Sequence, residues 1–217
     1  MLISTRDFPT DPAPVFAGQH AAEWNEIKRA LQAVPVHLKA SDQAGIQGNP
    51  IFDPVGTNSA ISAALGRHGW RLIALPAQYA LGIGLDFAKN GVIVEVQFSN
   101  YPFLINNVFR ADFLYSQGVR IDHLGTTEAL VIITKGVMFP ASNSTLYYEQ
   151  AVNTLTRHFP FTIPTRIVGL QERRGRAVQV HFTEYAAARY SRVVALQSPR
   201  AVRFIGEAGR RCRVEAR

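Results

Sequence analysis

A chain of 217 residues, of which 47% are hydrophobic, is long enough to form one domain with a substantial core and too apolar to be disordered throughout. Its single cysteine, Cys212, excludes an intramolecular disulfide framework and fits a reducing compartment. The N-terminus has no signal-peptide pattern and no apolar run reaches transmembrane length, so we expect a cytoplasmic protein without a membrane partner.

The net charge of +7 is unevenly distributed along the chain. Residues 157–217 carry 13 arginines against 4 glutamates, a net +9, whereas residues 1–156 carry 10 basic and 12 acidic residues, a net −2. The planar guanidinium group matches the oxygens of a phosphate, so this segment favours nucleic acid as the partner. The alternative is a surface that only keeps the protein soluble.

The first part of the chain predicts two helices, two single strands and a hairpin before residue 99. In order, we expect an irregular lead-in (1–15), an amphipathic helix (17–34), a short strand (36–38), a Gly- and Pro-rich loop (40–56), a helix capped by Thr57 or Asn58 and ending near Arg67, a strand (71–75) and a hairpin (85–98).

The hairpin is the strongest local signal. Asn90-Gly91 between two apolar, β-branched runs predicts a type I′ turn, which needs positive φ at both central residues. The second run, from Val92 to Phe98, is apolar on both faces and is typical of a central strand covered on both sides. A carboxylate in such a strand, here Glu95, is rarely left without a compensating partner.

With a two-residue loop, Asp86 would lie directly opposite Glu95, and Gln97 would lie opposite Gly84 on the same face. Two carboxylates placed in this way destabilise a sheet unless a cation or a shared proton relieves their repulsion. The pattern therefore suggests a site for a hard divalent cation. An edge hairpin with a solvated face is the other interpretation.

The second part of the chain continues the alternation of helices and strands. It predicts a helix from Pro102 to about Gln117, a buried strand (129–134), a polar loop (135–144), a helix (145–159) and two strands (166–170 and 177–182). This order indicates an α/β fold with a central mixed β-sheet flanked by helices. We expect a single domain spanning residues 1–217.

The spacing of Asp86, Glu95-Val96-Gln97 and the following helix resembles the PD-(D/E)XK nuclease core, with Gln97 in place of its lysine and Leu85 in place of its proline. With Phe98-Ser99-Asn100-Tyr101 added, the pattern is similar to the BglII/BstYI family of type II restriction endonucleases. The likeness extends more loosely from about residue 58 to about residue 148. It implies a restriction-endonuclease-like nuclease core at about 57–170, followed by a basic, β-containing C-terminal subdomain at about 171–217.

The resemblance implies cleavage of double-stranded DNA by a homodimer at a short palindrome centred on GATC, of the AGATCT or RGATCY type. A palindrome is read by an interface with two-fold symmetry. Our hypothesis is that Asp86, Glu95 and the backbone carbonyl of Val96 bind Mg²⁺, and that Gln97 positions the attacking water. These groups make Asp86, Glu95 and Gln97 the expected catalytic residues.

The expected DNA contacts come from two loops and the basic tail. They are Ser99, Asn100, Ser142, Asn143, Ser144, Tyr190 and Arg192. Base contact by 142–144 follows from the resemblance, and an asparagine suits adenine; capping of the next helix is the alternative. Tyr185 and Arg189 are further candidates that the sequence does not rank. Asn58 is a possible accessory residue near the metal water, with N-capping as the simpler role.

Three other functions remain open at this point. Because the lysine is missing, the core could be inert in a sequence-specific DNA-binding protein. A repair or junction-cleaving nuclease could share the same core. A metal-binding domain with no DNA role would leave the arginine-rich tail as surface only. The sequence fixes neither the bases that flank GATC, nor methylation sensitivity, nor the dimer interface.

Overall fold

A computed structural model describes residues 1–9, 15–82, 84–121, 124–142, 145–158, 160–187 and 192–216. Its elements in chain order are β1 (Leu2–Phe8), α1 (Ala21–Ala33), β2 (Val36–Ala40), β3 (Pro50–Phe52), α2 (Pro54–Gly66), β4 (Arg71–Ala74), η1 (Ala77–Tyr79), β5 (Gly84–Lys89), β6 (Val92–Val96), α3 (Pro102–Ser116), β7 (Arg120–Ile121), β8 (Gly125–Thr126), β9 (Ala129–Lys135), α4 (Tyr148–Arg157), β10 (Thr165–Gln171), β11 (Ala177–Tyr185), β12 (Val194–Ile205) and β13 (Arg213–Ala216).

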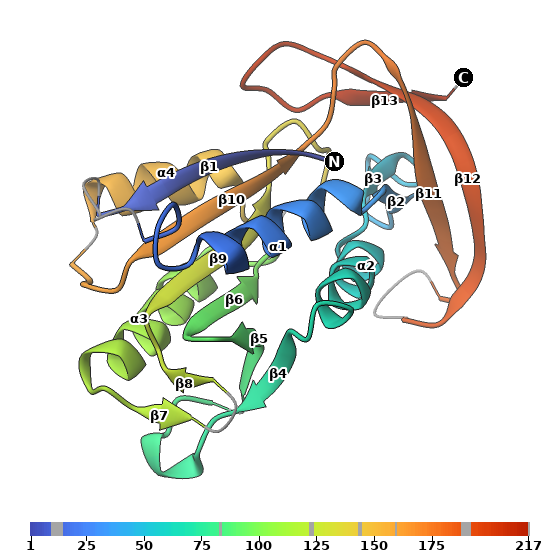
Figure 1. Cartoon of the computed structure of the whole chain (residues 1–217). Helices are drawn as coiled ribbons and strands as arrows, with labels where there is room; N and C mark the ends of the chain where they lie inside the picture. Colours follow the sequence, from blue (N-terminus) through green and yellow to red (C-terminus); the bar gives the residue numbers. More distant parts are fainter. Residues whose placement is uncertain are drawn as a thin grey trace.

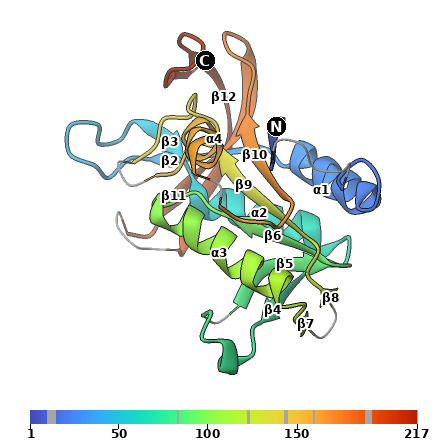
Figure 2. The same cartoon turned by 90° about the vertical axis from the view of Figure 1, so that its left-hand side faces the viewer.

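A six-stranded mixed sheet forms the centre of the molecule, in the order β1-β10-β9-β6-β5-β4. β6, β9 and β10 run parallel, and antiparallel strands complete both sides of this group. Helices α1 and α2 cover one face of the sheet, and α3 and α4 cover the other (Figures 1 and 2). The predicted α/β fold with a central mixed sheet flanked by helices is therefore confirmed.

The sequence of β6 shows why it occupies the middle of this sheet. Val92 and Val94 pack with Ile27 of α1 and Ile61 of α2, whereas Ile93 packs on the opposite side with Leu104 of α3. Apolar side chains on alternating faces leave no face for water, so the strand is buried by helices on both sides. Glu95 and Gln97 follow in the same alternation and continue the face that α3 covers.

A second sheet of five strands lies beside the first, in the order β13-β12-β11-β2-β3. The basic C-terminal segment supplies β11, β12 and β13, and the segment between α1 and α2 supplies β2 and β3. β11 and β12 form a long antiparallel hairpin at the edge of the molecule (Figure 1). The arginine-rich strands thus share a sheet with two strands from a distant part of the sequence.

Three expectations about the elements are wrong. The lead-in is not irregular, because Leu2–Phe8 pairs with β10 as the edge strand of the main sheet. The loop at 40–56 contains β3, whose residues pair with β2. The helix expected over 145–159 begins only at Tyr148, because residues before it run extended beside the end of β9.

In the described part of the chain, no helix is long and apolar enough to cross a membrane.

Candidate active site

The hairpin of β5 and β6 has the predicted turn. Asn90 has a φ of 47° and Gly91 a φ of 82°, so both central residues lie in the left-handed region, as a type I′ turn requires. The strands pair as expected next to the turn, with Lys89 opposite Val92 and Phe87 opposite Val94. The turn therefore fixes where each acidic residue lies along its strand.

The pairing stops before the two carboxylates meet as ladder partners. The predicted register is observed, but the last pair of the β5–β6 ladder is Phe87 with Val94, so the expected pairs of Asp86 with Glu95 and of Gly84 with Gln97 are not part of the ladder. Instead, Oδ2 of Asp86 accepts a hydrogen bond from the Val96 N–H at 2.9 Å. The side chain of Asp86 thus reaches across the opening hairpin and replaces a main-chain bond.

Glu95 is an almost fully buried acid, with 5% of its surface exposed. Burial, and next the charge of Asp86, raise the pKa of Glu95 to about 8, while the Arg110 guanidinium opposes the rise. Within the described residues, Oε1 of Glu95 has no hydrogen-bond partner. A buried carboxylate oxygen without a donor, next to a second carboxylate, is a group that a cation would satisfy.

Helix α3 brings two polar residues to this face that the sequence did not single out. Arg110 donates through Nη2 to the carbonyl of Gly84, at the start of β5, and its charge acts on Glu95. Asn107 is buried and its amide lies 3.5 Å from Oε1 of Gln97. The two residues are three apart and so lie on one side of the helix. Only a known helix orientation could have revealed them.

Gln97 is held by neighbours on both sides of its amide. Its Nε2 donates to Oγ of Ser99 at 2.9 Å, and its Oε1 faces Asn107. Its own N–H donates to the carbonyl of Ile133 on β9, which fixes the main chain just beyond β6. The amide is therefore positioned by the strand, by the following turn and by α3.

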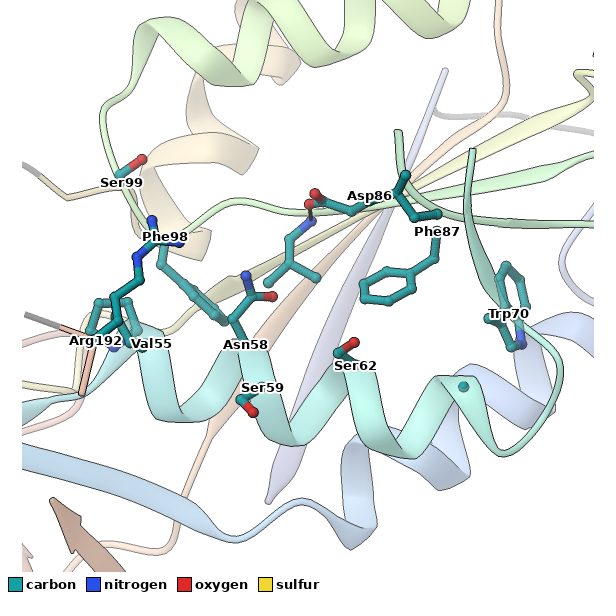
Figure 3. Close-up of a pocket in the computed structure, with 14 residues that line it drawn as sticks. Val55, Asn58, Ser59, Ser62, Trp70, Asp86, Phe87, Phe98, Ser99 and Arg192 are labelled. Carbon is teal, nitrogen blue, oxygen red and sulfur yellow. Dashed lines mark hydrogen bonds between the residues drawn. The ribbon is translucent and has the colours of Figure 1, made fainter. Parts of the chain in front are cut away.

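A cleft of about 630 Å³ opens beside the hairpin, between β5, β6 and helix α2. Asp86 lines one wall and Asn58 lines the facing wall (Figure 3), and Val96 is also among the lining residues. Ser99 and Arg192 lie at one end of it. Glu95 and Gln97 do not line this cleft; they lie on the side of the sheet covered by α3.

Asn58 is not a helix cap. Helix α2 begins at Pro54, and its N-cap is Asp53, whose Oδ1 accepts the Val55 N–H at 3.1 Å. Asn58 is therefore inside the helix, with its exposed amide directed toward the strands (Figure 3). The simpler role for Asn58 is wrong, and its place in the cleft agrees with the accessory one.

The structure describes only some of the residues expected to contact DNA. Ser99, Asn100, Ser142 and Arg192 are exposed. Asn143, Ser144, Arg189 and Tyr190 lie outside the described residues. Tyr185 donates its hydroxyl to Oδ2 of Asp53 at 2.7 Å, so that hydroxyl already has a protein partner.

The donors at this site fit a small hard cation. Two carboxylates meet here, and a main-chain carbonyl of β6 could complete the protein ligands, with water or phosphate oxygens at the remaining positions. No group of three or more His, Cys, Asp or Glu side chains suited to a metal occurs in the described ranges.

Residues 12–170 match the family described as Restriction endonuclease BglII/BglIII. The chain is 47% identical over 176 residues to the type II restriction enzyme BglII of Bacillus subtilis, covering 79% of this chain and 78% of that protein. The chain belongs to the BglII/BglIII family of restriction endonucleases. The prediction of a type II restriction endonuclease is thereby confirmed.

Two solved structures of BglII resemble this chain over the full length of both proteins. The structure of BglII complexed with a DNA 16-mer superposes with a TM-score of 0.91 at 39% identity. The structure of free BglII gives a TM-score of 0.73 at 33% identity. The arrangement of this BglII-family chain is thus nearer to the DNA complex than to the free enzyme.

Proposed function

We propose that this BglII-family enzyme uses Mg²⁺ to hydrolyse both strands of a DNA palindrome centred on GATC, of the AGATCT or RGATCY type. One observation carries the catalytic part of the proposal: the buried Oε1 of Glu95, which has no hydrogen-bond partner among the described residues, belongs to a carboxylate beside that of Asp86. The name of the family and the DNA complex of its relative support the substrate.

In the proposed reaction, Asp86, Glu95 and the carbonyl of Val96 hold the metal. Mg²⁺ bound there supplies Lewis acidity toward the phosphate and lowers the pKa of a bound water. Gln97 orients the attacking water through its amide, which Ser99 and Asn107 hold in place. A neutral amide is a weak base, so Gln97 acts in orientation rather than in proton abstraction.

We propose that the exposed polar residues around the cleft bind DNA. Arg192 would contact phosphate, and Ser99, Asn100 and the segment 142–144 would lie against base edges, with Tyr190 as a further contact. Asn58 would reach a water of the metal from across the cleft. The nuclease core (about 57–170) and the basic subdomain (about 171–217) would act within one domain.

A palindromic site requires two copies of the chain related by a two-fold axis. Helix α3 supports such an assembly, because Phe103 and Phe109 are 48% and 53% exposed on it. Large apolar side chains left in water are a feature of surfaces that bind protein. We expect sedimentation of the wild-type protein to give a dimer and that of Phe109→Asp to give a monomer.

Plasmid DNA incubated with the protein and Mg²⁺ tests the proposed function. Discrete fragments whose ends map to one GATC-containing palindrome support it. Nicks at branched or damaged substrates would assign the core to repair. A mobility shift without cutting would leave an inert DNA-binding protein, in agreement with the glutamine at position 97 where the core motif has lysine.

A further inference from the structure

The main-chain carbonyl of Phe98, one residue past Gln97, accepts hydrogen bonds from three donors. These are Nζ of Lys135 at 2.8 Å, Oγ1 of Thr145 at 3.0 Å and the N–H of Leu146 at 3.4 Å. One donor belongs to the last residue of β9 and the other two belong to residues 145 and 146. The end of the catalytic strand is thus hydrogen-bonded to Thr145 and Leu146, which directly follow the segment proposed to read DNA.

Leu146 and Tyr147 lie between the end of the catalytic strand and the end of β9. Up to Gln97 the catalytic strand bonds directly to β9, through the N–H of Gln97 and the carbonyl of Ile133. One residue later its partner is Leu146, and Lys135 of β9 pairs instead with Tyr147. Leu146 therefore replaces β9 as the hydrogen-bonded neighbour of Phe98.

The Lys135 side chain links Phe98 and Leu146. Its Nζ also donates to the carbonyl of Leu146 at 3.3 Å, so one ammonium joins the catalytic strand to the chain that follows residue 144. The side chain is only 2% exposed and its Nζ lies 5.2–5.7 Å from the ring centres of Phe52, Phe98 and Tyr147. Burial, and next the charge of Arg211, lower the pKa of Lys135 to about 7.

Burying an ammonium group costs desolvation free energy, which an apolar side chain at the same core position would not cost. An apolar side chain cannot donate to the carbonyls of Phe98 and Leu146, whereas the Lys135 ammonium donates to both. Other donors share each carbonyl, since that of Leu146 also accepts from Oγ1 of Thr134 at 3.0 Å, but only an ammonium at this position links the two where the sheet changes partner. Its place in the fold is therefore set by the two segments it joins.

We propose that Lys135 is a positioning residue that couples recognition of the DNA bases to the placement of Gln97. The inference rests on the proposed function. A base contact that displaces residue 144 would also displace Thr145 and Leu146. Both of these residues donate hydrogen bonds to the Phe98 carbonyl, which would then move with them. Phe98 lies between Gln97 and Ser99, which are themselves hydrogen-bonded. A wrong base would thus displace the amide that orients water.

The test compares Lys135→Met with Thr145→Val, using the dimeric full-length enzyme. Lys135→Met keeps the volume and removes the ammonium; Thr145→Val keeps the ammonium and removes one donor to the Phe98 carbonyl. Lys89→Met is the matched control, because Lys89 also donates to a main-chain carbonyl, that of His68 at 2.8 Å, but far along the hairpin from the site. Thermal unfolding establishes that each variant is folded.

The readouts are kcat and KM on a cognate duplex and on duplexes with one changed base pair. We expect Lys135→Met to lower kcat by about tenfold or more with little change in KM, because misplacement of a reacting group by about 1 Å can cost about a hundredfold. The ratio of cognate to changed-site cleavage should fall as well. Thr145→Val should shift both quantities in the same direction and by less, and Lys89→Met should shift neither.

Wild-type kcat and wild-type discrimination in Thr145→Val and in folded Lys135→Met would overturn the coupling while leaving the proposed function intact. If Lys135→Met does not fold, Thr145→Val alone decides. Failure of the wild-type enzyme to cut any duplex would instead overturn the proposed function, and the coupling with it.

Discussion

The Asp86 carboxylate and the Val96 N–H are joined by a 2.9 Å hydrogen bond that crosses the hairpin just beyond its last backbone pair. The bond ties one oxygen of Asp86 to the strand that carries Glu95. It also holds two acidic side chains close together at the point where the hairpin would otherwise separate. The protein thus uses a side chain to keep a repulsive pair assembled.

Loss of either acid should stop cleavage without preventing DNA binding. We expect Asp86→Asn and Glu95→Gln each to lower the single-turnover rate by more than about a hundredfold, since second-shell partners alone contribute 10- to 100-fold at metal sites. Glu207→Gln, a change on a side chain that is 78% exposed, is the control. Cutting at the wild-type rate by either acid variant would remove these residues from the metal site.

Without metal, the folded protein should lose stability as the pH rises from about 4.5 to about 8. The pKa of Glu95 is raised to about 8 in the folded state, so between these values the folded state keeps a proton that the unfolded state has released. Asp86 and Arg110 are the charged groups that face it. Unfolding temperatures measured in EDTA across this range check the slope.

Glu95→Gln should flatten that slope, because an amide does not titrate, and should make the protein more stable at pH 8 in EDTA. Mg²⁺ should raise the unfolding temperature of the wild type at pH 8 and leave that of Glu95→Gln almost unchanged. An unaltered slope in Glu95→Gln would show that other groups set the pH dependence.

Arg110→Met should increase the Mg²⁺ concentration that half-maximal cleavage requires at pH 7. The guanidinium lowers the pKa of Glu95, so its removal strengthens the competition of the proton with the metal. We expect a several-fold increase at pH 7 that shrinks at pH 9, where the proton is lost anyway. An equal increase at both pH values would point to lost packing rather than to charge.

Gly91→Ala should destabilise the protein by about 1–3 kcal/mol, the usual cost of a strained backbone. Gly91 has a φ of +82°, and an added Cβ would lie 3.1 Å from the Thr126 carbonyl oxygen. Gly175→Ala is the matched control, since its φ is +70° but a Cβ there meets nothing within 4 Å. Denaturant unfolding of both variants separates the backbone strain from the contact.

The sequence predicted the hairpin well because its turn chemistry is local. Asn90 and Gly91 alone determine the turn, and three backbone pairs follow from it. The expected pairing ends one residue further on, where the Asp86 carboxylate accepts the Val96 N–H instead. Strand alternation assumes that a ladder continues, and it contains no information about where a side chain replaces a main-chain partner.

Other parts of the site depend on contacts between distant segments. Arg110 and Asn107 are ordinary polar positions in a helical pattern, and only the packing of α3 turns them toward Glu95 and Gln97. Lys135 is predicted to begin a polar loop, but it is the last residue of β9 and is 2% exposed. The strand at Leu2–Phe8 was missed for the same reason, because its partner, β10, lies more than 150 residues away.

The second sheet limits how specificity could be exchanged between members of this family. Its C-terminal strands are bonded to β2, through the parallel pairing of Val36–Lys39 with Val180–Thr183. A chimera joined only near residue 170 would set one parent's β11 against the other parent's β2. Grafts of the arginine-rich hairpin should therefore carry residues 36–52 from the same donor.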